Sequence, residues 1–471
     1  MIDKAREVAL KTLYKIDKEK AYSNIALDEQ IKENINNLNE KDIGLISEIV
    51  YGTTTWKLTI DEIIKKYSNI KIKKISFWIL NILRMGIYQI IFLDKIPKSA
   101  AVNESVNLAK RYGHKSSSNF VNAILRKVDK KDYQEMFLIK DNVERISKTT
   151  SMPVWIIEEL LKEMPIEKVE NICESSNIKP KVTIRINNLK TTKEELLKKL
   201  EERNIQYEEG TLEEFIILKK AKNIEKLDIF KQGLFTIQDE AAGLAAKTLG
   251  VLPNDRVLDA CSAPGGKTTY LAEIMKNKGE IIAWDIHEHR TKLVQDTAKR
   301  LGISIIETQV KDASVFNPEY IEKFDKILLD VPCLGIGVLK RKPDIKWSRN
   351  KEDIDKITQL QKNILENCSK YLKKNGFLVY STCSILRQEN IDIIEWFLKK
   401  NPNFKITTIN LEDFYKQYYR NDEYIQVYQN SKSDGFFICK LTKKWVKNKY
   451  YKNITLILHL NKMYWLFIKK R

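Results

Sequence analysis

Residues 257–269 have the sequence VLDACSAPGGKTT, which predicts a strand, a turn and a helix in succession. Val257 and Leu258 predict a buried strand, the glycine pair predicts a tight turn, and the residues after it predict the start of a helix. Paired glycines let a ligand approach the backbone closely, and a helix N-terminus offers it free N–H groups. The spacing GxxxxGK[ST] of a phosphate loop is absent, because only Ala263 and Pro264 separate Ser262 from the glycines. The turn therefore suits a nucleoside better than a nucleotide phosphate.

Apolar β-rich runs alternate with helical stretches around this turn. The runs include residues 257–258, 281–284, 305–306, 327–329 and 377–380. Such alternation is typical of a parallel sheet that is covered by helices on both faces. We predict a Rossmann-like, doubly wound α/β domain over residues 234–444.

Two further carboxylates follow predicted strands at positions suited to a nucleoside. Asp285 ends the strand after the glycine turn, where a carboxylate can bind both ribose hydroxyls. Asp312 follows the third strand, and in methyltransferase-like sheets that position reaches the adenine amino group. An isolated glycine turn would be ordinary loop structure, and an isolated Asp312 would be an ordinary surface residue. Three sites in register favour a cofactor.

Two cysteines stand where later strands end: Cys333 after Asp330-Val331-Pro332, and Cys383 after Ser381-Thr382. A cysteine is more often a small buried hydrophobe, and we keep that interpretation for Cys368 and Cys439. Two thiols facing one crevice instead indicate chemistry. A thiolate that adds to carbon 6 of cytosine activates carbon 5 toward a methyl donor, and such a base must first leave its stack. Lys267 could favour the thiolate and Asp330 could stabilise the charge pushed into the ring, but the spacing leaves the roles of the two cysteines interchangeable.

The remaining chain divides into three further parts. Residues 1–131 have the three- and four-residue periodicity of an all-helical domain, with polar breaks at Ser68-Asn69 and Lys115–Ser118. Residues 132–233 mix predicted helices with strands at Lys181–Asn187 and Phe215–Leu218, and Thr191–Glu194 has the pattern of a capping box that opens a helix. Residues 445–471 form a tail of unknown role, whose apolar run Ile454–Leu460 is short for a membrane anchor.

Composition narrows the partners and the compartment. The formal net charge of +19 favours a polyanion such as nucleic acid. Six cysteines without a CxxC pair indicate a reducing cytoplasm, and the N-terminus lacks the features of a signal peptide. The stretch Phe77–Leu93 contains Asn81, Arg84 and Gln89, so we predict a buried helix rather than a membrane span. None of the four histidines has the spacing of a zinc ligand, so no metal is expected.

At these motifs the chain resembles the Nop2/Sun family of RNA 5-methylcytosine methyltransferases. The resemblance rests on Asp259–Lys267, Asp330–Cys333 and Ser381–Cys383. It implies S-adenosylmethionine as the cofactor, Cys383 as the nucleophile and Cys333 as the residue that assists product release. DNA cytosine methyltransferases instead use the cysteine after proline as nucleophile, so this division of roles belongs to the resemblance alone. The implied cofactor-binding residues are Cys261, Ser262, Ala263, Pro264, Gly265, Gly266, Lys267, Asp285, Asp312 and Asp330.

The front of the chain resembles a NusB-like RNA-binding domain. This resemblance rests on Tyr88-Gln89, Ala101–Val106 and Phe120–Arg126. The combination of the two domains is similar to bacterial enzymes that methylate small-subunit ribosomal RNA. This similarity implies small-subunit ribosomal RNA as the partner, and a cytoplasmic monomer that holds no metal. Leu334 departs from the family pattern, in which serine usually follows the cysteine.

Two other functions compete with this interpretation. An RNA-binding or antitermination factor with an idle methyltransferase fold would have no use for the cysteine pair, Lys267 and the three acidic positions. An amino-group methyltransferase would have an aromatic residue where Cys333 stands.

Overall fold

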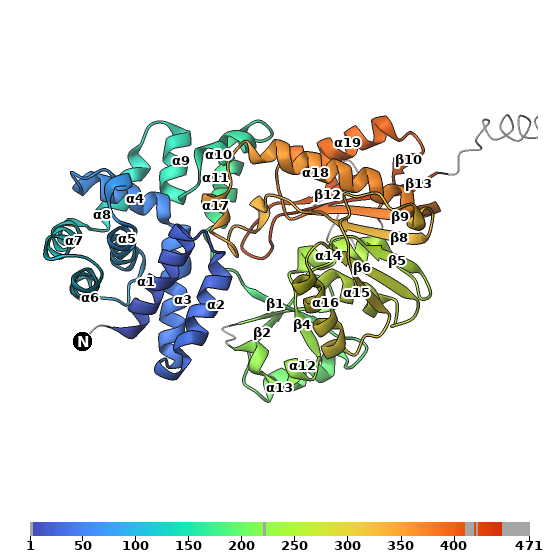
Figure 1. Ribbon diagram of the computed structural model, residues 1–471, viewed down its shortest axis with the longest axis horizontal. Coiled ribbons are helices and arrows are strands. Elements are labelled where there is room, and N and C mark those ends of the chain that lie inside the picture. The colour runs from blue at the N-terminus through green and yellow to red at the C-terminus, as the bar shows by residue number, and fades with distance from the viewer. Residues whose placement is uncertain (1–2, 220–222, 410–418, 421–422, 445–471) are drawn as a thin grey trace, which may run out of the picture.

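The computed structural model describes residues 3–219, 223–409, 419–420 and 423–444, arranged as Figure 1 shows. An array of helices is followed by a small antiparallel sheet and then by a large mixed sheet. The predicted tail at 445–471 lies outside the described residues.

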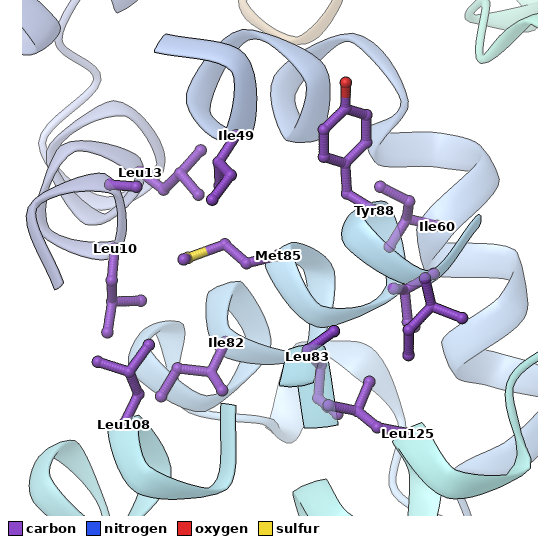
Figure 2. Packing of buried hydrophobic residues seen from close by; sticks show 14 of the residues in the cluster. Leu10, Leu13, Ile49, Ile60, Ile82, Leu83, Met85, Tyr88, Leu108 and Leu125 are labelled. Carbon is purple, nitrogen blue, oxygen red and sulfur yellow. The ribbon is translucent and has the colours of Figure 1, made fainter. Parts of the chain in front are cut away.

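The front helices enclose one apolar core around α5 (Phe77–Phe92). Around it lie α1 (Lys4–Lys18), α2 (Ser23–Asn34), α3 (Glu40–Thr55), α4 (Lys57–Tyr67), α6 (Lys98–Tyr112) and α7 (Lys115–Lys127). Figure 2 shows Ile82 and Met85 of α5 among Leu10 of α1, Ile49 of α3 and Leu108 of α6. The predicted all-helical front is confirmed.

The polar residues of α5 explain why so apolar a helix belongs inside a globular domain. Arg84 is buried and donates to both carboxylate oxygens of Asp61 at 2.7 Å and to Asp17 at 2.6 Å. A buried guanidinium requires such pairing. The predicted buried helix is thus confirmed, and no helix in the described part of the chain is both long and apolar enough to cross a bilayer.

One of the two predicted helix breaks is wrong. Ser68 does end α4, but Lys115–Ser118 form the first turn of α7. His114 precedes that turn, its backbone N–H donates to Ser117 Oγ, and Ser118 Oγ donates to the Lys115 carbonyl. Serines that form hydrogen bonds with backbone groups in this way favour the first turn of a helix. The polar run Lys115–Ser118 therefore begins α7 and is not a loop between two helices.

The middle of the chain contributes short helices and then a sheet. The helices are α8 (Lys131–Gln134), α9 (Asn142–Thr150), α10 (Val154–Leu161) and α11 (Ile166–Ser175). The sheet has the order β2-β3-β1-β4 and is antiparallel throughout, formed by β1 (Val182–Ile186), β2 (Tyr207–Glu209), β3 (Phe215–Leu218) and β4 (Phe235–Ile237). The helices α12 (Lys193–Glu201) and α13 (Asp228–Lys231) complete this part. Both predicted strands are confirmed, and the predicted capping box forms one residue later, between Thr192 and Glu195.

A large sheet with the order β11-β12-β13-β9-β8-β5-β6-β7 forms the rest. Its parallel strands are β5 (Arg256–Asp259), β6 (Glu280–Asp285), β7 (Ile306–Val310), β8 (Phe324–Asp330) and β9 (Leu372–Thr382). The antiparallel strands β13 (Phe436–Lys443), β12 (Tyr424–Val427) and β11 (Tyr419–Arg420) continue it beyond β9, and β10 (Phe404–Ile406) pairs with β13. The predicted α/β class is confirmed.

Helices cover both faces of this sheet. Val257 packs toward α14 (Glu240–Leu249), α15 (Gly266–Ile274) and α16 (Glu288–Leu301), which lie below the sheet in Figure 1. Its neighbour Leu258 packs toward α18 (Asp353–Cys368) and α19 (Ile391–Lys400) above the sheet. Because both faces of the sheet are buried, neighbouring residues of a strand such as Val257 and Leu258 are both apolar.

The short helix α17 (Ile345–Ser348) joins the catalytic sheet to the front domain. Trp347 Nε1 donates to the Thr54 carbonyl at 2.6 Å, and Ser23 Oγ donates to the Asp344 carboxylate. Lys346 of the same helix is buried and donates to Asn177 Oδ1 at 2.7 Å and to the Ser151 carbonyl at 3.2 Å. The front domain therefore contacts the segment that follows Cys333.

Candidate active site at the carboxyl edge of the sheet

The predicted site residues lie along the edge where the parallel strands end. The order β8-β5-β6 places the topological switch point between β5 and β8, where ligands of such sheets bind. Lys267 follows β5 and Asp330 ends β8, and their side chains meet across this point, with Nζ 2.8 Å from Oδ2. Ser381 of β9 donates to the other oxygen of Asp330 at 3.0 Å.

The glycine turn after β5 packs closely against α16. Gly265 has φ of +100°, and a Cβ there would lie 3.1 Å from Val294 Cα, so a side chain is excluded both by the backbone conformation and by α16. The Gly265 N–H donates to the Ser262 carbonyl at 2.8 Å, and both Ser262 N and Oγ donate to the Trp284 carbonyl. These bonds fix residues 261–266 against the end of β6.

Asp259 is a buried carboxyl beneath this turn. Its Oδ2 accepts a hydrogen bond from Thr268 at 2.7 Å, whereas its buried Oδ1 has no partner among the described residues. Burial raises the pKa of Asp259 to about 7, although the Thr268 bond lowers it. An unpaired buried acceptor is costly, so a donor on a bound ligand would stabilise this position.

The two carboxylates predicted to hold the nucleoside differ in setting. Asp285 is buried at the end of β6, accepts from the His287 N–H at 3.1 Å and forms an ion pair with Arg290 at 3.3 Å. Asp312 is exposed and accepts from both the N–H and the hydroxyl of Ser314. The Asp285 carboxylate is thus held by the loop after β6 and by Arg290 of α16, whereas Asp312 is held by its own loop.

The structure brings the two strand-end cysteines together, with Cys333 Sγ 3.0 Å from Cys383 Sγ. Both are free and partly exposed, whereas Cys368 and Cys439 are buried, as predicted for core residues. The hydrogen bond with Cys383, together with burial, raises the pKa of Cys333 well above its usual value. Burial likewise raises the pKa of the Cys261 thiol in the glycine turn.

Lys267 carries positive charge beside this pair. Burial lowers its pKa, but the adjacent Asp330 outweighs burial, and negative charge on Cys383 would raise the pKa further. Its Nζ also lies 5.1 Å from the centre of the Phe436 ring. The ammonium, the carboxylate and two thiols therefore share one small region.

Three chain segments cross directly behind the cysteines. The Gly337 N–H donates to the Cys383 carbonyl at 2.9 Å, and the Gly435 N–H donates to the Gly337 carbonyl at 2.8 Å. A Cβ on Gly337 would lie 2.2 Å from the Gly435 oxygen and 2.8 Å from the Cys383 oxygen. Only glycine permits this approach, which ties the two cysteine loops together.

Sequence reasoning missed two residues with many contacts here, Glu389 and Arg185. Glu389 is fully buried and accepts hydrogen bonds from the residues that follow each cysteine, Leu334 and Ser384. Arg185 of β1 is also fully buried and binds Glu273 of α15 and the Gly266 carbonyl. Neither lies in a motif that indicates chemistry.

Leu334, where the family pattern usually has serine, fits its surroundings. Its side chain is buried in an apolar cluster with Ile385, Leu386 and Ile157 of α10. Its backbone N–H provides the contact to Glu389, so the substitution does not disturb the turn. In the part of the chain that the structure describes, no group of three or more His, Cys, Asp or Glu residues is arranged to hold a metal ion.

Comparison with known proteins matches this site to one family. Residues 246–442 match the family described as 16S rRNA methyltransferase RsmB/F. Over 444 residues the chain is 38% identical to the probable ribosomal RNA small subunit methyltransferase B of Bacillus subtilis, covering 93% of this chain and 98% of that protein. The chain belongs to this family. The resemblance inferred from the motifs is therefore confirmed, and the protein is an RsmB/F methyltransferase that acts on ribosomal RNA.

Two further family models match earlier parts of this RsmB/F methyltransferase. Residues 3–130 match the NusB family, and residues 152–225 match the ferredoxin-like domain of RsmF/B-like methyltransferases. Ribosomal RNA small subunit methyltransferase B of Shewanella oneidensis is 32% identical over 86% of this chain and 92% of its own. The crystal structure of PH0851 is 27% identical, with a TM-score of 0.79 over 94% of this chain and all of that one.

Proposed function

We propose that this methyltransferase transfers a methyl group from S-adenosylmethionine to carbon 5 of one cytosine in small-subunit ribosomal RNA, through a covalent bond between Cys383 and carbon 6. The observation that carries the proposal is the pair of free thiols 3.0 Å apart beside the Lys267–Asp330 ion pair. A thiolate, a cation and a carboxylate together are what addition to a pyrimidine requires.

The turn after β5 has the features that this cofactor needs. The helix α15 begins at the glycine pair and offers its N-terminus to a ligand, and the unpaired Oδ1 of Asp259 can accept a hydrogen bond from the cofactor's amino group. We assign the ribose hydroxyls to Asp285, the adenine amino group to Asp312, and the remaining contacts to residues 261–267 and Asp330. When bound, the cofactor supplies the methyl group on its sulfonium.

Electrostatics supports Cys383 as the nucleophile. Negative charge on Cys383 raises the pKa of Lys267, so an ammonium group lies near the sulfur that we assign as the nucleophile. The pKa of Cys333 is raised instead, first by its hydrogen bond with Cys383 and then by burial. The negative charges of Glu389 and Asp330 raise the pKa of Cys333 further. Cys333 therefore stays a thiol while Cys383 attacks.

The reaction then follows from these positions. The Cys383 sulfur bonds to carbon 6, and the electrons pushed into the ring make carbon 5 nucleophilic. Lys267 and Asp330 offer an ammonium donor and a carboxylate acceptor to the polar edge of cytosine, which carries ring acceptors and an amino donor. After carbon 5 takes the methyl group, its proton leaves to a base, and the Cys383–carbon 6 bond breaks to restore the thiolate. We assign assistance in this release to Cys333.

The other domains fit RNA as the substrate. A net charge of +19 supports binding to a polyanion, and we propose that the NusB-like residues 1–131 and the module at 132–233 present opened RNA to the domain at 234–444. We further propose a cytoplasmic monomer that needs no metal. A thiol rather than an aromatic ring after Pro332 argues against amino-group methylation, since that chemistry stacks the base on an aromatic side chain.

Transfer of labelled methyl groups to unmodified small-subunit RNA tests the proposal. We expect label at a single cytosine carbon 5 with the wild-type chain, none with Cys383→Ala, and an RNA–protein adduct that survives denaturing electrophoresis with Cys333→Ala. Cys368→Ala, which removes a core thiol away from the site, serves as the control and should behave like wild type. An adduct in the Cys383→Ala variant instead would reverse the two roles, and absence of label on any cytosine would overturn the proposal.

A further inference from the structure

Glu389 connects the two cysteine loops through one carboxylate. It lies in the turn Arg387–Glu389 and is fully buried. Its Oε2 accepts from the Leu334 N–H at 2.8 Å, one residue after Cys333. Its Oε1 accepts from Ser384 Oγ, one residue after Cys383.

Two neighbouring amides complete this frame. Gln361 of α18 donates both to Glu389 at 3.1 Å and to the Pro332 carbonyl at 2.9 Å, so it holds the residue before Cys333. Asn390 accepts from Thr382 Oγ1 at 2.6 Å and donates to the Ser384 carbonyl at 3.1 Å, so it holds both neighbours of Cys383. Residues on both sides of each cysteine are thus fixed from one place.

Leu334, Gln361 and Ser384 each donate a hydrogen bond to the Glu389 carboxylate. An N–H of the backbone, an amide N–H and a hydroxyl point at its two oxygens. Burial raises the pKa of Glu389, but these three donors favour the ionised form. A carboxylate with such partners fixes geometry more strongly than a neutral acceptor does.

We propose that Glu389 is a positioning residue for methyl transfer, which holds the loop of Cys333 against that of Cys383 so that Cys333 can release the methylated base. This inference rests on the proposed function. Without the carboxylate, the Leu334 N–H and the Ser384 hydroxyl lose their shared partner. The bonds of Asn390 to Thr382 and to the Ser384 carbonyl remain and hold both neighbours of Cys383, whereas the Leu334 N–H beside Cys333 loses its side-chain acceptor.

The first test separates attack from release. In single-turnover reactions with small-subunit RNA, Glu389→Ala should accumulate the covalent adduct and release methylated RNA about 10- to 100-fold more slowly. This is the range expected for losing a hydrogen bond to a charged group. The KM for cofactor should change little, because the glycine turn is untouched. Glu389→Gln keeps an acceptor for the Leu334 N–H and should recover part of the rate.

A matched control shows whether any buried carboxylate would do. Glu159 is also buried and accepts from the neighbouring Gln388, but its other partners are Lys162 and Lys351. Glu159→Gln should therefore leave adduct and turnover at the wild-type level. Equal effects of Glu159→Gln and Glu389→Gln on adduct and turnover would overturn the assignment.

The second test needs no catalysis and also works if Glu389→Ala fails to fold. In a Cys383→Ala background, the rate of Cys333 alkylation by iodoacetamide is followed against pH with and without Glu389→Gln. The charges that act on Cys333 are then those of Glu389 and Asp330, and removing one of them should lower its pKa. An unchanged titration curve would refute the inference, whereas a wild-type chain that labels no cytosine would refute the proposed function instead.

Discussion

Replacing Arg185 with methionine should uncouple the small antiparallel sheet from the glycine turn after β5. The guanidinium is fully buried, and Glu273, its partner at 2.8 and 3.1 Å, is 4% exposed. It also donates to the Gly266 carbonyl at 2.8 Å and to Thr269 Oγ1 at 3.2 Å. Removing one partner of a buried ion pair leaves an uncompensated charge, which costs about 3–5 kcal/mol.

The pH dependence of this variant has a definite sign. In the wild type, burial raises the pKa of Glu273 and Arg185 lowers it. Without Arg185 the pKa rises further, so the folded state holds a proton that the unfolded state releases above about pH 4.5. The stability of Arg185→Met should therefore fall as pH rises above about 4.5 toward the raised pKa of Glu273.

Native-state hydrogen exchange of α15 measures the local cost, and calorimetry with S-adenosylmethionine measures cofactor affinity. Arg185→Met should reduce both the protection of α15 and the affinity. The double variant Arg185→Met with Glu273→Met should recover most of the protection, because the buried charge is gone. Strictly additive losses in the double variant, or full protection in the single one, would refute this reasoning.

Three further predictions concern the cofactor and the joint between domains. Asp285→Ala should weaken cofactor binding at least about tenfold by calorimetry, and the exposed Asp312→Ala should weaken it less; the reverse order would contradict the assigned roles. Burial lowers the pKa of Lys346 to about 7, so between pH 7 and 9 this amine is protonated in the unfolded chain but not in the folded one. The free energy of unfolding of the wild type should therefore rise by about 2.5 kcal/mol over this range, and urea titrations of Lys346→Met should lack that rise. Trp347→Phe leaves the Thr54 carbonyl without its donor, so amides at the end of α3 should lose about 1–3 kcal/mol of exchange protection, with unchanged exchange in α6 as the internal control.

The sequence predicted those features that depend on periodicity and on where strands end. The strand ends place Asp259, Asp330 and Cys383 at one edge because the carboxyl ends of parallel strands share that edge. The meeting of Cys333 and Cys383 could be expected for the same reason. The family follows from those motifs, and the comparisons confirm it.

Contacts between parts that are remote in sequence were not predictable. The alternation around Arg185 indicated one polar face of β1, but Thr183, Arg185 and Asn187 are all buried because that face packs on the catalytic domain. Alternation distinguishes the two faces of a strand without saying what each face meets. Glu389 lies in the polar run Arg387–Asn390, which is typical of a surface turn, and its role depends on three separate segments.

The crossing at Gly337 limits how this pair of thiols can be built. Each cysteine sits at the end of its own strand, yet their separation depends on a third segment that passes within van der Waals contact of both loops. Placing two cysteines at neighbouring strand ends of another α/β protein would supply the sulfur atoms without the shared backbone contact. A designer who wishes to transfer this chemistry must move the glycine crossing together with the thiols.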